Sequence, residues 1–120
     1  MITWFCPECF AEVDETAERC PACGCSTDMT GWTYEQKVLK ALDHRHLPDR
    51  RVLAAQILGR LRSRAAVPRL AELAGDPTDL YLAAEAARSL ALIDPDHPVV
   101  LRLREAGPLL VRTSLRQVAR

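Results

Sequence analysis

The residues best suited to chemistry are four cysteines near the N-terminus, arranged as two pairs with the same internal spacing. Cys6-Pro-Glu-Cys9 is followed, after ten residues, by Cys20-Pro-Ala-Cys23. A gap of two residues lets one tight turn aim both thiolates at an ion while backbone N–H groups point at the sulfurs. Because all four ligands are thiolates and no position is left for water, the spacing predicts one structural, non-catalytic Zn²⁺.

The residues around the pairs fit such turns. Pro7 and Pro21 fix φ at the second position of each turn, and Gly24 supplies the positive φ that usually follows the second pair. The fifth cysteine, Cys25, has no activating partner beside it in the sequence, which favours an inert bystander over a competing ligand.

Two other uses of the four cysteines remain open. Two disulfides would require an oxidising compartment, and the N-terminus lacks the basic and apolar regions of a secretory signal. No stretch approaches the length of a membrane span, so we expect a cytoplasmic protein without a membrane partner. Iron of the rubredoxin type uses similar turns, but on a longer scaffold with an aromatic core.

Residues 4–25 resemble the short zinc-ribbon family, whose pattern is C-P-x-C-G, about ten residues, and C-P-x-C-G again. The acidic stretch 11–19 resembles the connector of that family. Phe10 stands where the family has glycine, so we expect it to cover the metal or to dock on the rest of the chain. The resemblance implies a small β module held by Cys6, Cys9, Cys20 and Cys23.

From residue 33 onward the apolar residues follow a helical period, and no strand-like alternation appears. Thr33 and Gln36 fit a capping box at the start of the first helix. Gly75 is expected to end the third helix, and Asp76-Pro77 to form the following turn. We expect six helices, beginning near residues 33, 49, 63, 78, 98 and 109.

The helical part also contains an internal repeat. Val67 recurs as Val99, an interval of 32 residues. The same interval relates Ala54, Ala55, Leu58 and Leu61 to Ala86, Ala87, Leu90 and Ile93. A period near 30 with paired helices is typical of an α-solenoid, in which each hairpin buries its apolar face on its neighbours.

Residues 47–106 resemble HEAT-like repeats of the type found in bilin-lyase relatives. The resemblance is carried by Arg51, Leu58-Gly59, Val67-Pro68 and Asp76-Pro77, although Ala91 replaces the glycine in the second copy. It implies a mostly α fold, a short α-solenoid of HEAT-like hairpins with residues 33–46 as the second helix of a partial first repeat. So short an array must cover its ends, either with the ribbon or with a second subunit.

Charge and composition divide the chain in two. Its 120 residues carry 16 basic and 16 acidic side chains. Residues 1–33 hold six acidic residues against Arg19 alone, a net charge of −5, which leaves +5 for residues 34–120. We expect a zinc-ribbon module over 1–31 and a HEAT-like domain over 32–120, with Trp4, Phe5, Phe10 and Trp32 available to join them. A uniformly basic nucleic-acid binder is excluded.

The remaining residues offer little catalytic chemistry. The five glycines form no phosphate-binding loop, and His44 and His46 point to different faces of a helix, so we expect no enzyme. A basic cluster in the helical part is the candidate partner surface; it comprises Arg50, Arg51, Arg60, Arg62, Arg64 and Arg69. A second basic set comprises Arg102, Arg104, Arg112, Arg116 and Arg120.

Two functions fit this surface. The first is an adaptor that binds another protein, with the zinc ribbon in a structural role. The second is a nucleic-acid-associated protein that holds phosphates through the arginines. The acidic ribbon would repel phosphate and few aromatic residues are available for base stacking, so we favour the adaptor.

Overall fold

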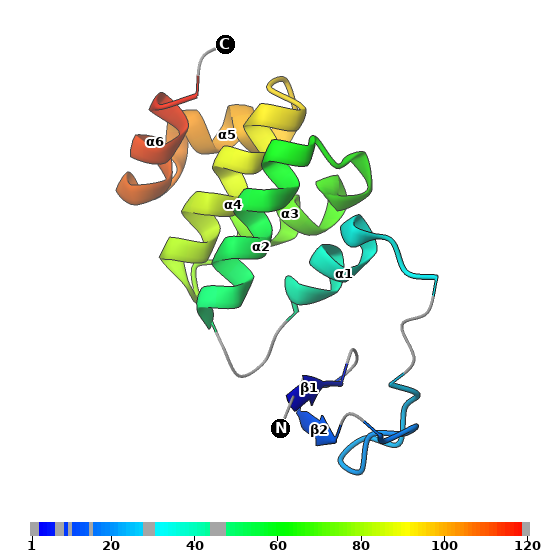
Figure 1. The fold of residues 1–120 in the computed structure, drawn as a ribbon. Coiled ribbons are helices and arrows are strands. Elements are labelled where there is room, and N and C mark those ends of the chain that lie inside the picture. The colour runs from blue at the N-terminus through cyan, green and yellow to red at the C-terminus, as the bar shows by residue number, and fades with distance from the viewer. Residues whose placement is uncertain are drawn as a thin grey trace.

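The computed structural model describes residues 3–6, 9, 11–14, 16–27, 31–43 and 48–118. It is mostly helical, with two short strands before the first helix (Figure 1). The elements in chain order are β1 (Thr3–Phe5), β2 (Glu12–Asp14), α1 (Tyr34–Ala41), α2 (Pro48–Leu61), the 3₁₀ turn η1 (Arg64–Ala66), α3 (Val67–Ala74), α4 (Leu80–Ile93), α5 (Pro98–Ala106) and α6 (Leu109–Arg116).

The ends of the helices are set by side chains that satisfy free backbone groups. The capping box predicted before α1 is confirmed, because Thr33 accepts from the N–H of Gln36 and the Gln36 side chain accepts from the N–H of Thr33. Gly75 caps the C-terminus of α3, as predicted. Asp79 begins α4 by accepting two backbone N–H bonds, which places the start two residues later than the sequence indicated.

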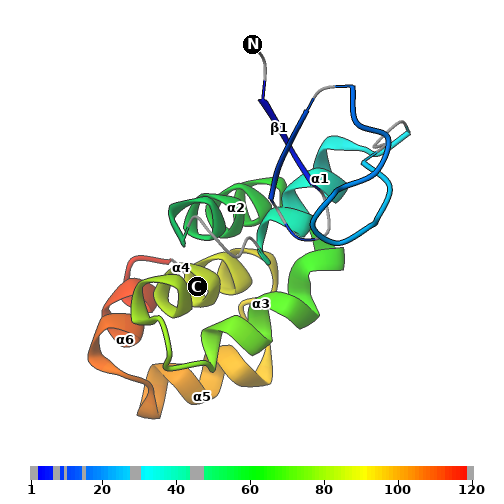
Figure 2. The same cartoon turned by 90° about the horizontal axis from the view of Figure 1, so that it is seen from below.

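The helices form two layers, which are separated most clearly in Figure 2. One layer contains α2, α4 and α6 side by side, and the other contains α1, α3 and α5. α4 packs against both α2 and α6 within its layer, and against α3 in the other layer. Nine of its side chains are buried, so α4 forms the centre of the core.

The layer of α2 and α4 is held by an unusually close approach of the two backbones. A Cβ atom on Gly59 would lie 2.5 Å from the Ser89 hydroxyl and 2.9 Å from the Ser89 Cα. The Ser89 hydroxyl donates to the carbonyl oxygen of Ala55 at 2.6 Å. Only glycine fits at this contact, which explains the Leu58-Gly59 pair in physical terms.

The repeat seen in the sequence corresponds to shared burial. Ala54, Ala55 and Leu58 on α2 are buried, as are their counterparts one repeat later on α4. Leu61 differs from its counterpart Ile93, because Leu61 is 48% exposed and Ile93 only 6%. The extensively packed hairpins are α1–α2, α3–α4 and α5–α6, which is a different grouping from the α2–α3 unit that the repeat suggested.

The strands belong to a separate module with its own small core. Cys6, Val13 and Cys20 are buried together there, apart from the cluster that the helices share. No strand is among the extensively packed partners of the described helices, and the module lies beside α1 in both views (Figures 1 and 2). The radius of gyration is 15.8 Å, above the value of about 13.6 Å for a compact domain of this length.

The expected ribbon cap depended on aromatic side chains that are only partly described. The side chains of Trp4 and Phe10 lie outside the described residues. Trp32 is half-buried and lines an open depression of about 490 Å³ with Gly31, Gln36, Leu39 and Lys40. Phe5 is 39% exposed. Capping of the helices by this module therefore stays a prediction.

Candidate metal centre and arginine surface

Each half of the cysteine module is a small antiparallel hairpin that carries one cysteine pair. In the first, β1 pairs with β2 so that Trp4 lies opposite Val13. The turn beyond β1 is closed by a bond of 2.9 Å from the N–H of Cys6 to the carbonyl of Ala11. Cys6 and Cys9 are thereby held in one tight connection, as the pair spacing requires.

The second hairpin brings Arg19 opposite Ser26 and holds Cys20 and Cys23 in its turn. The N–H of Cys20 donates to the carbonyl of Cys25, and the N–H of Gly24 donates to the carbonyl of Cys20. Gly24 has a φ of +79°, which confirms the positive φ predicted there. Any other residue would strain this turn.

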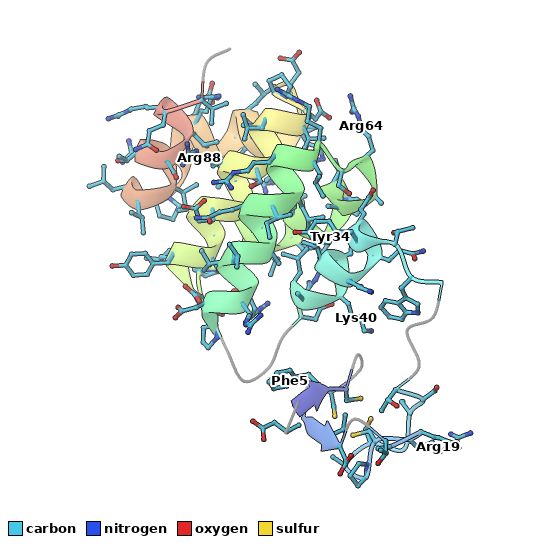
Figure 3. All side chains as sticks on the ribbon, viewed as in Figure 1. Phe5, Arg19, Tyr34, Lys40, Arg64 and Arg88 are labelled. Carbon is cyan, nitrogen blue, oxygen red and sulfur yellow. The ribbon has the colours of Figure 1, made fainter. Side chains whose placement is uncertain are left out.

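The two hairpins bring four sulfurs to one point (Figure 3). All four Sγ atoms lie within 4.8 Å of one another. The Sγ atoms of Cys6 and Cys23 are 3.5 Å apart, and those of Cys9 and Cys20 are 3.6 Å apart. An ion that four sulfurs coordinate tetrahedrally, with bonds of about 2.3 Å, needs sulfur–sulfur distances of about 3.8 Å. The cluster therefore fits one metal ion, held by all four cysteines.

Protonation of the metal-free cluster is uneven. The backbone N–H of Cys23, helped by that of Ala22, lowers the pKa of Cys20 to about 7. The N–H of Cys25 lowers the pKa of Cys23, but burial and the neighbouring thiols outweigh it and raise that pKa to about 12. A similar balance raises the pKa of Cys9 above its usual value. Four thiolates at neutral pH thus require a cation among them.

Cys25 lies at the edge of this cluster, where its thiol is one of the neighbours that raise the pKa of Cys23. Its side chain is exposed, and the four-thiol group found among the described residues does not include it. Its carbonyl oxygen accepts from the N–H of Cys20, so its backbone helps shape the site. The bystander role of Cys25 stays a prediction.

Three of the six arginines in the predicted partner surface make contacts within the chain, and Arg51 and Arg69 are two of them. Arg51 donates from Nε to the carbonyl of Leu42 at 2.7 Å, which ties the start of α2 to the end of α1. Arg69 pairs with Asp43 at 2.6 Å and with Glu72 at 2.9 Å. Both guanidinium groups therefore join helices of this chain.

A third arginine, Arg62, ends α2 in an unusual conformation. Its φ is +53°, a left-handed value normally taken by glycine. The N–H of Ser63 donates to the carbonyl of Leu58, and the N–H of Arg62 donates to the carbonyl of Gly59. This pair of hydrogen bonds defines a Schellman cap. The Arg62 guanidinium donates to the carbonyl of Leu92 and so bridges the ends of α2 and α4.

The other three arginines of that set, Arg50, Arg60 and Arg64, are exposed. Figure 3 shows Arg64 projecting from the edge of the array beside η1, away from α4. Arg60 instead lies at the α2–α4 junction, where it helps to line a depression of about 90 Å³. The other residues that line this depression are Gln56, Glu85, Arg88, Ser89 and Leu92.

Arg88 belongs to a surface that was not predicted from the sequence. Each helix of the α2–α4–α6 layer carries an exposed large apolar residue and, seven residues later, an exposed arginine. A separation of seven residues returns to the same side of a helix, about 10.5 Å further along. Arg60 and Arg88 line the same depression, and α4 packs against both α2 and α6. We therefore group six residues as the three-helix face: Leu53 and Arg60 on α2, Tyr81 and Arg88 on α4, and Leu109 and Arg116 on α6.

The residues of the three-helix face recur along the chain at a constant interval. Leu53, Tyr81 and Leu109 are 28 residues apart, as are the three arginines. The apolar residues are 47%, 75% and 66% exposed. No hydrogen bond or ion pair joins these three arginines to another residue in the described part of the chain. The signal was present in the sequence as an interval of 28 beside the interval of 32.

No protein-family model, curated protein or solved structure matches this chain. Among its described helices, none is both long and apolar enough to span a membrane. The cysteine cluster and the surface of the helices are therefore the features of this chain that bear on its function.

Proposed function

We propose that this protein is a non-catalytic, zinc-binding adaptor that binds another protein through its helical surface. The observation that carries the proposal is the three-helix face, where three exposed apolar side chains accompany three exposed arginines. Exposed apolar side chains that join into one patch with a polar rim are typical of a protein-binding surface.

The fold supports this proposal through its layered arrangement. The stacking of α2, α4 and α6 fits a short HEAT-like α-solenoid over residues 32–120, whose regular helices present side chains at a fixed interval. Residues 1–31 form the zinc-ribbon domain in this proposal, because the four sulfurs match a tetrahedral site. A closed tetrathiolate site suits a structural ion, and Zn²⁺ is favoured over rubredoxin-type iron because the stretch between the two cysteine pairs contains no aromatic residue besides Phe10.

The adaptor proposal is tested by affinity purification from the native host with zinc retained. Wild type, Arg88→Glu and the matched control Arg64→Glu are used as bait, since both arginines are exposed and only Arg88 belongs to the three-helix face. We expect wild type and the control to retain the same protein and Arg88→Glu to lose it. Retention that is equal for all three baits would assign binding to another surface.

Nucleic-acid binding is the second candidate, and the row Arg60, Arg88 and Arg116 is the observation that favours it. Three phosphate contacts would make affinity fall steeply with salt because binding releases counterions. A mobility-shift titration with duplex DNA and single-stranded RNA decides the matter at about 50 mM salt, where such binding is strongest. Absence of a shift there removes this candidate.

A further inference from the structure

The three-helix face has a chemical complement elsewhere in the same chain. Residues 1–33 carry a net charge of −5, and the carboxylates of Glu12, Asp14 and Glu18 are exposed on the cysteine module. Phe5 on β1 adds an apolar side chain that is 39% exposed. The module therefore offers acidic and apolar groups, where the face offers arginines and apolar groups.

The chain's own module does not cover this face. Both cartoon views place the module beside α1, in the opposite direction from α6 (Figures 1 and 2). Figure 3 likewise shows Arg19 of the module and Arg88 of the face at opposite ends of the molecule. In the extended chain, the acidic and basic surfaces are thus both open to another molecule.

We propose that the cysteine module of a second copy of this chain docks on the three-helix face. Exposed carboxylates of the module meet Arg60, Arg88 and Arg116, while its apolar surface covers Tyr81 and the neighbouring leucines. The proposal rests on the adaptor function, because it names a partner for the surface assigned there. Nucleic acid could satisfy the arginines but would leave the apolar row uncovered.

Reciprocal docking closes the assembly. When each module sits on the face of the other chain, both chains make the same two contacts, and a two-fold symmetric dimer results. The ionic half of this contact is exposed at its rim, so added salt weakens it. Glu85 lines the same depression as Arg60 and Arg88, so its one carboxylate offsets only part of the charge of the three arginines.

The test measures the oligomeric state of the full-length, zinc-loaded chain by analytical ultracentrifugation at about 50 mM and about 500 mM salt. We expect wild type to form a dimer whose dissociation constant rises at least about tenfold at the higher salt. Arg88→Glu weakens the dimer about tenfold or more at low salt, and Arg64→Glu changes it less than about threefold. Far-UV circular dichroism checks that each variant keeps the wild-type helix content.

A charge exchange then identifies the docked surface. Glu12→Arg on the module and Arg88→Glu on the face each weaken self-association, because both contacts of either homodimer then oppose like charges. In a mixed dimer one contact has the wild-type charges and the other has both charges reversed, so opposite charges face each other at both contacts. We expect the mixture to associate more strongly than either variant alone. Because Glu12 is exposed on β2, this substitution leaves the cysteine cluster intact.

A wild-type chain that stays monomeric up to about 200 µM at low salt overturns the proposal. So does a dimer that Arg88→Glu leaves unchanged, or a mixture that shows no recovery. The adaptor function is tested separately from the dimer. A chain that stays monomeric but retains a foreign protein through Arg88 supports the adaptor function and contradicts self-association. A nucleic-acid complex with a monomeric chain assigns the arginines to phosphate instead.

Discussion

At the scale of single residues, Gly59 and the four cysteines set the tightest geometric demands on the sequence. Gly59 allows α2 and α4 to touch through their backbones, and the cysteines bring four sulfurs to one point. Both the α2–α4 backbone approach and the sulfur–sulfur distances leave little tolerance in the positions of the atoms. Substitutions there test the packing and the metal site directly.

Gly59→Ala is expected to destabilise the helical core by about 1–3 kcal/mol. The added methyl group would meet the Ser89 Cα at 2.9 Å, and backbone cannot move aside as a flexible side chain can. Gly75→Ala is the matched control, because a Cβ there meets only carbonyl oxygens at 3.7 Å or more, and we expect a change within about 0.5 kcal/mol. Urea unfolding followed by circular dichroism measures both.

Metal affinity is expected to fall as the pH is lowered. Binding requires thiolates, and the raised pKa values of Cys9 and Cys23 mean that both sulfurs carry protons in the metal-free chain near neutral pH. A cation must displace at least these two protons, so its apparent affinity drops about a hundredfold or more for each pH unit below 8. Competition with a chromophoric chelator between pH 6 and 8 measures the slope. A slope near zero would mean that the cluster is already deprotonated.

At the scale of the secondary-structure elements, the connections between helices rely on arginines that donate to carbonyl oxygens. Arg51 reaches the end of α1, Arg62 the end of α4, and Arg104 donates to the carbonyl of Leu115 on α6. A positive charge near a helix C-terminus also interacts favourably with the helix dipole. Arginine in this chain is therefore a structural residue as well as a surface one.

Arg62→Gly is expected to be more stable than Arg62→Ala by about 1 kcal/mol. Both variants lose the bond to Leu92, so their difference isolates the cost of the left-handed backbone at this position. Thermal unfolding of the two variants side by side provides the measurement. Equal stabilities would indicate that the Schellman cap relaxes when the side chain is shortened.

The sequence predicts the elements better than their contacts. Six helices, the capping box at Thr33 and the positive φ at Gly24 were all predicted from local signals, since spacing and backbone preference act within a few residues. The carbonyl partners of Arg51 and Arg62 were not predicted, because every residue carries a carbonyl and its accessibility depends on tertiary packing. Of the predicted metal site, the ligand set followed from spacing alone, whereas the closeness of the sulfurs needed the structure.

At the scale of the whole molecule, the chain contains two cores that share no described residue. One is built around Cys6, Val13 and Cys20, and the other around the helices. The charge and composition of the sequence predict two modules that meet at residues 31 and 32, and that boundary stays a prediction. The sequence did not predict the grouping of α3 with α4, because the apolar stripe of a helix does not specify which neighbour will cover it.

Removal of the metal is expected to unfold the cysteine module and to leave the helices intact. The module has little core of its own, so it depends on the ion, whereas the helical cluster contains no cysteine. Treatment with a chelator should change the circular dichroism signal at 222 nm and the thermal midpoint of the helices only slightly. A midpoint lowered by several degrees would instead support capping of the helices by the module, one of the two ways in which the sequence suggests that the ends of the array are covered.

The central position of α4 has a consequence for the slowest motions of the protein. Its backbone amides are shielded by α2, α3 and α6 together, so exposing them requires the whole array to open. Amides in the middle of α4 should therefore exchange with deuterium only through global unfolding. Those of α1 and α5, which have fewer neighbours, should exchange through local opening well before that.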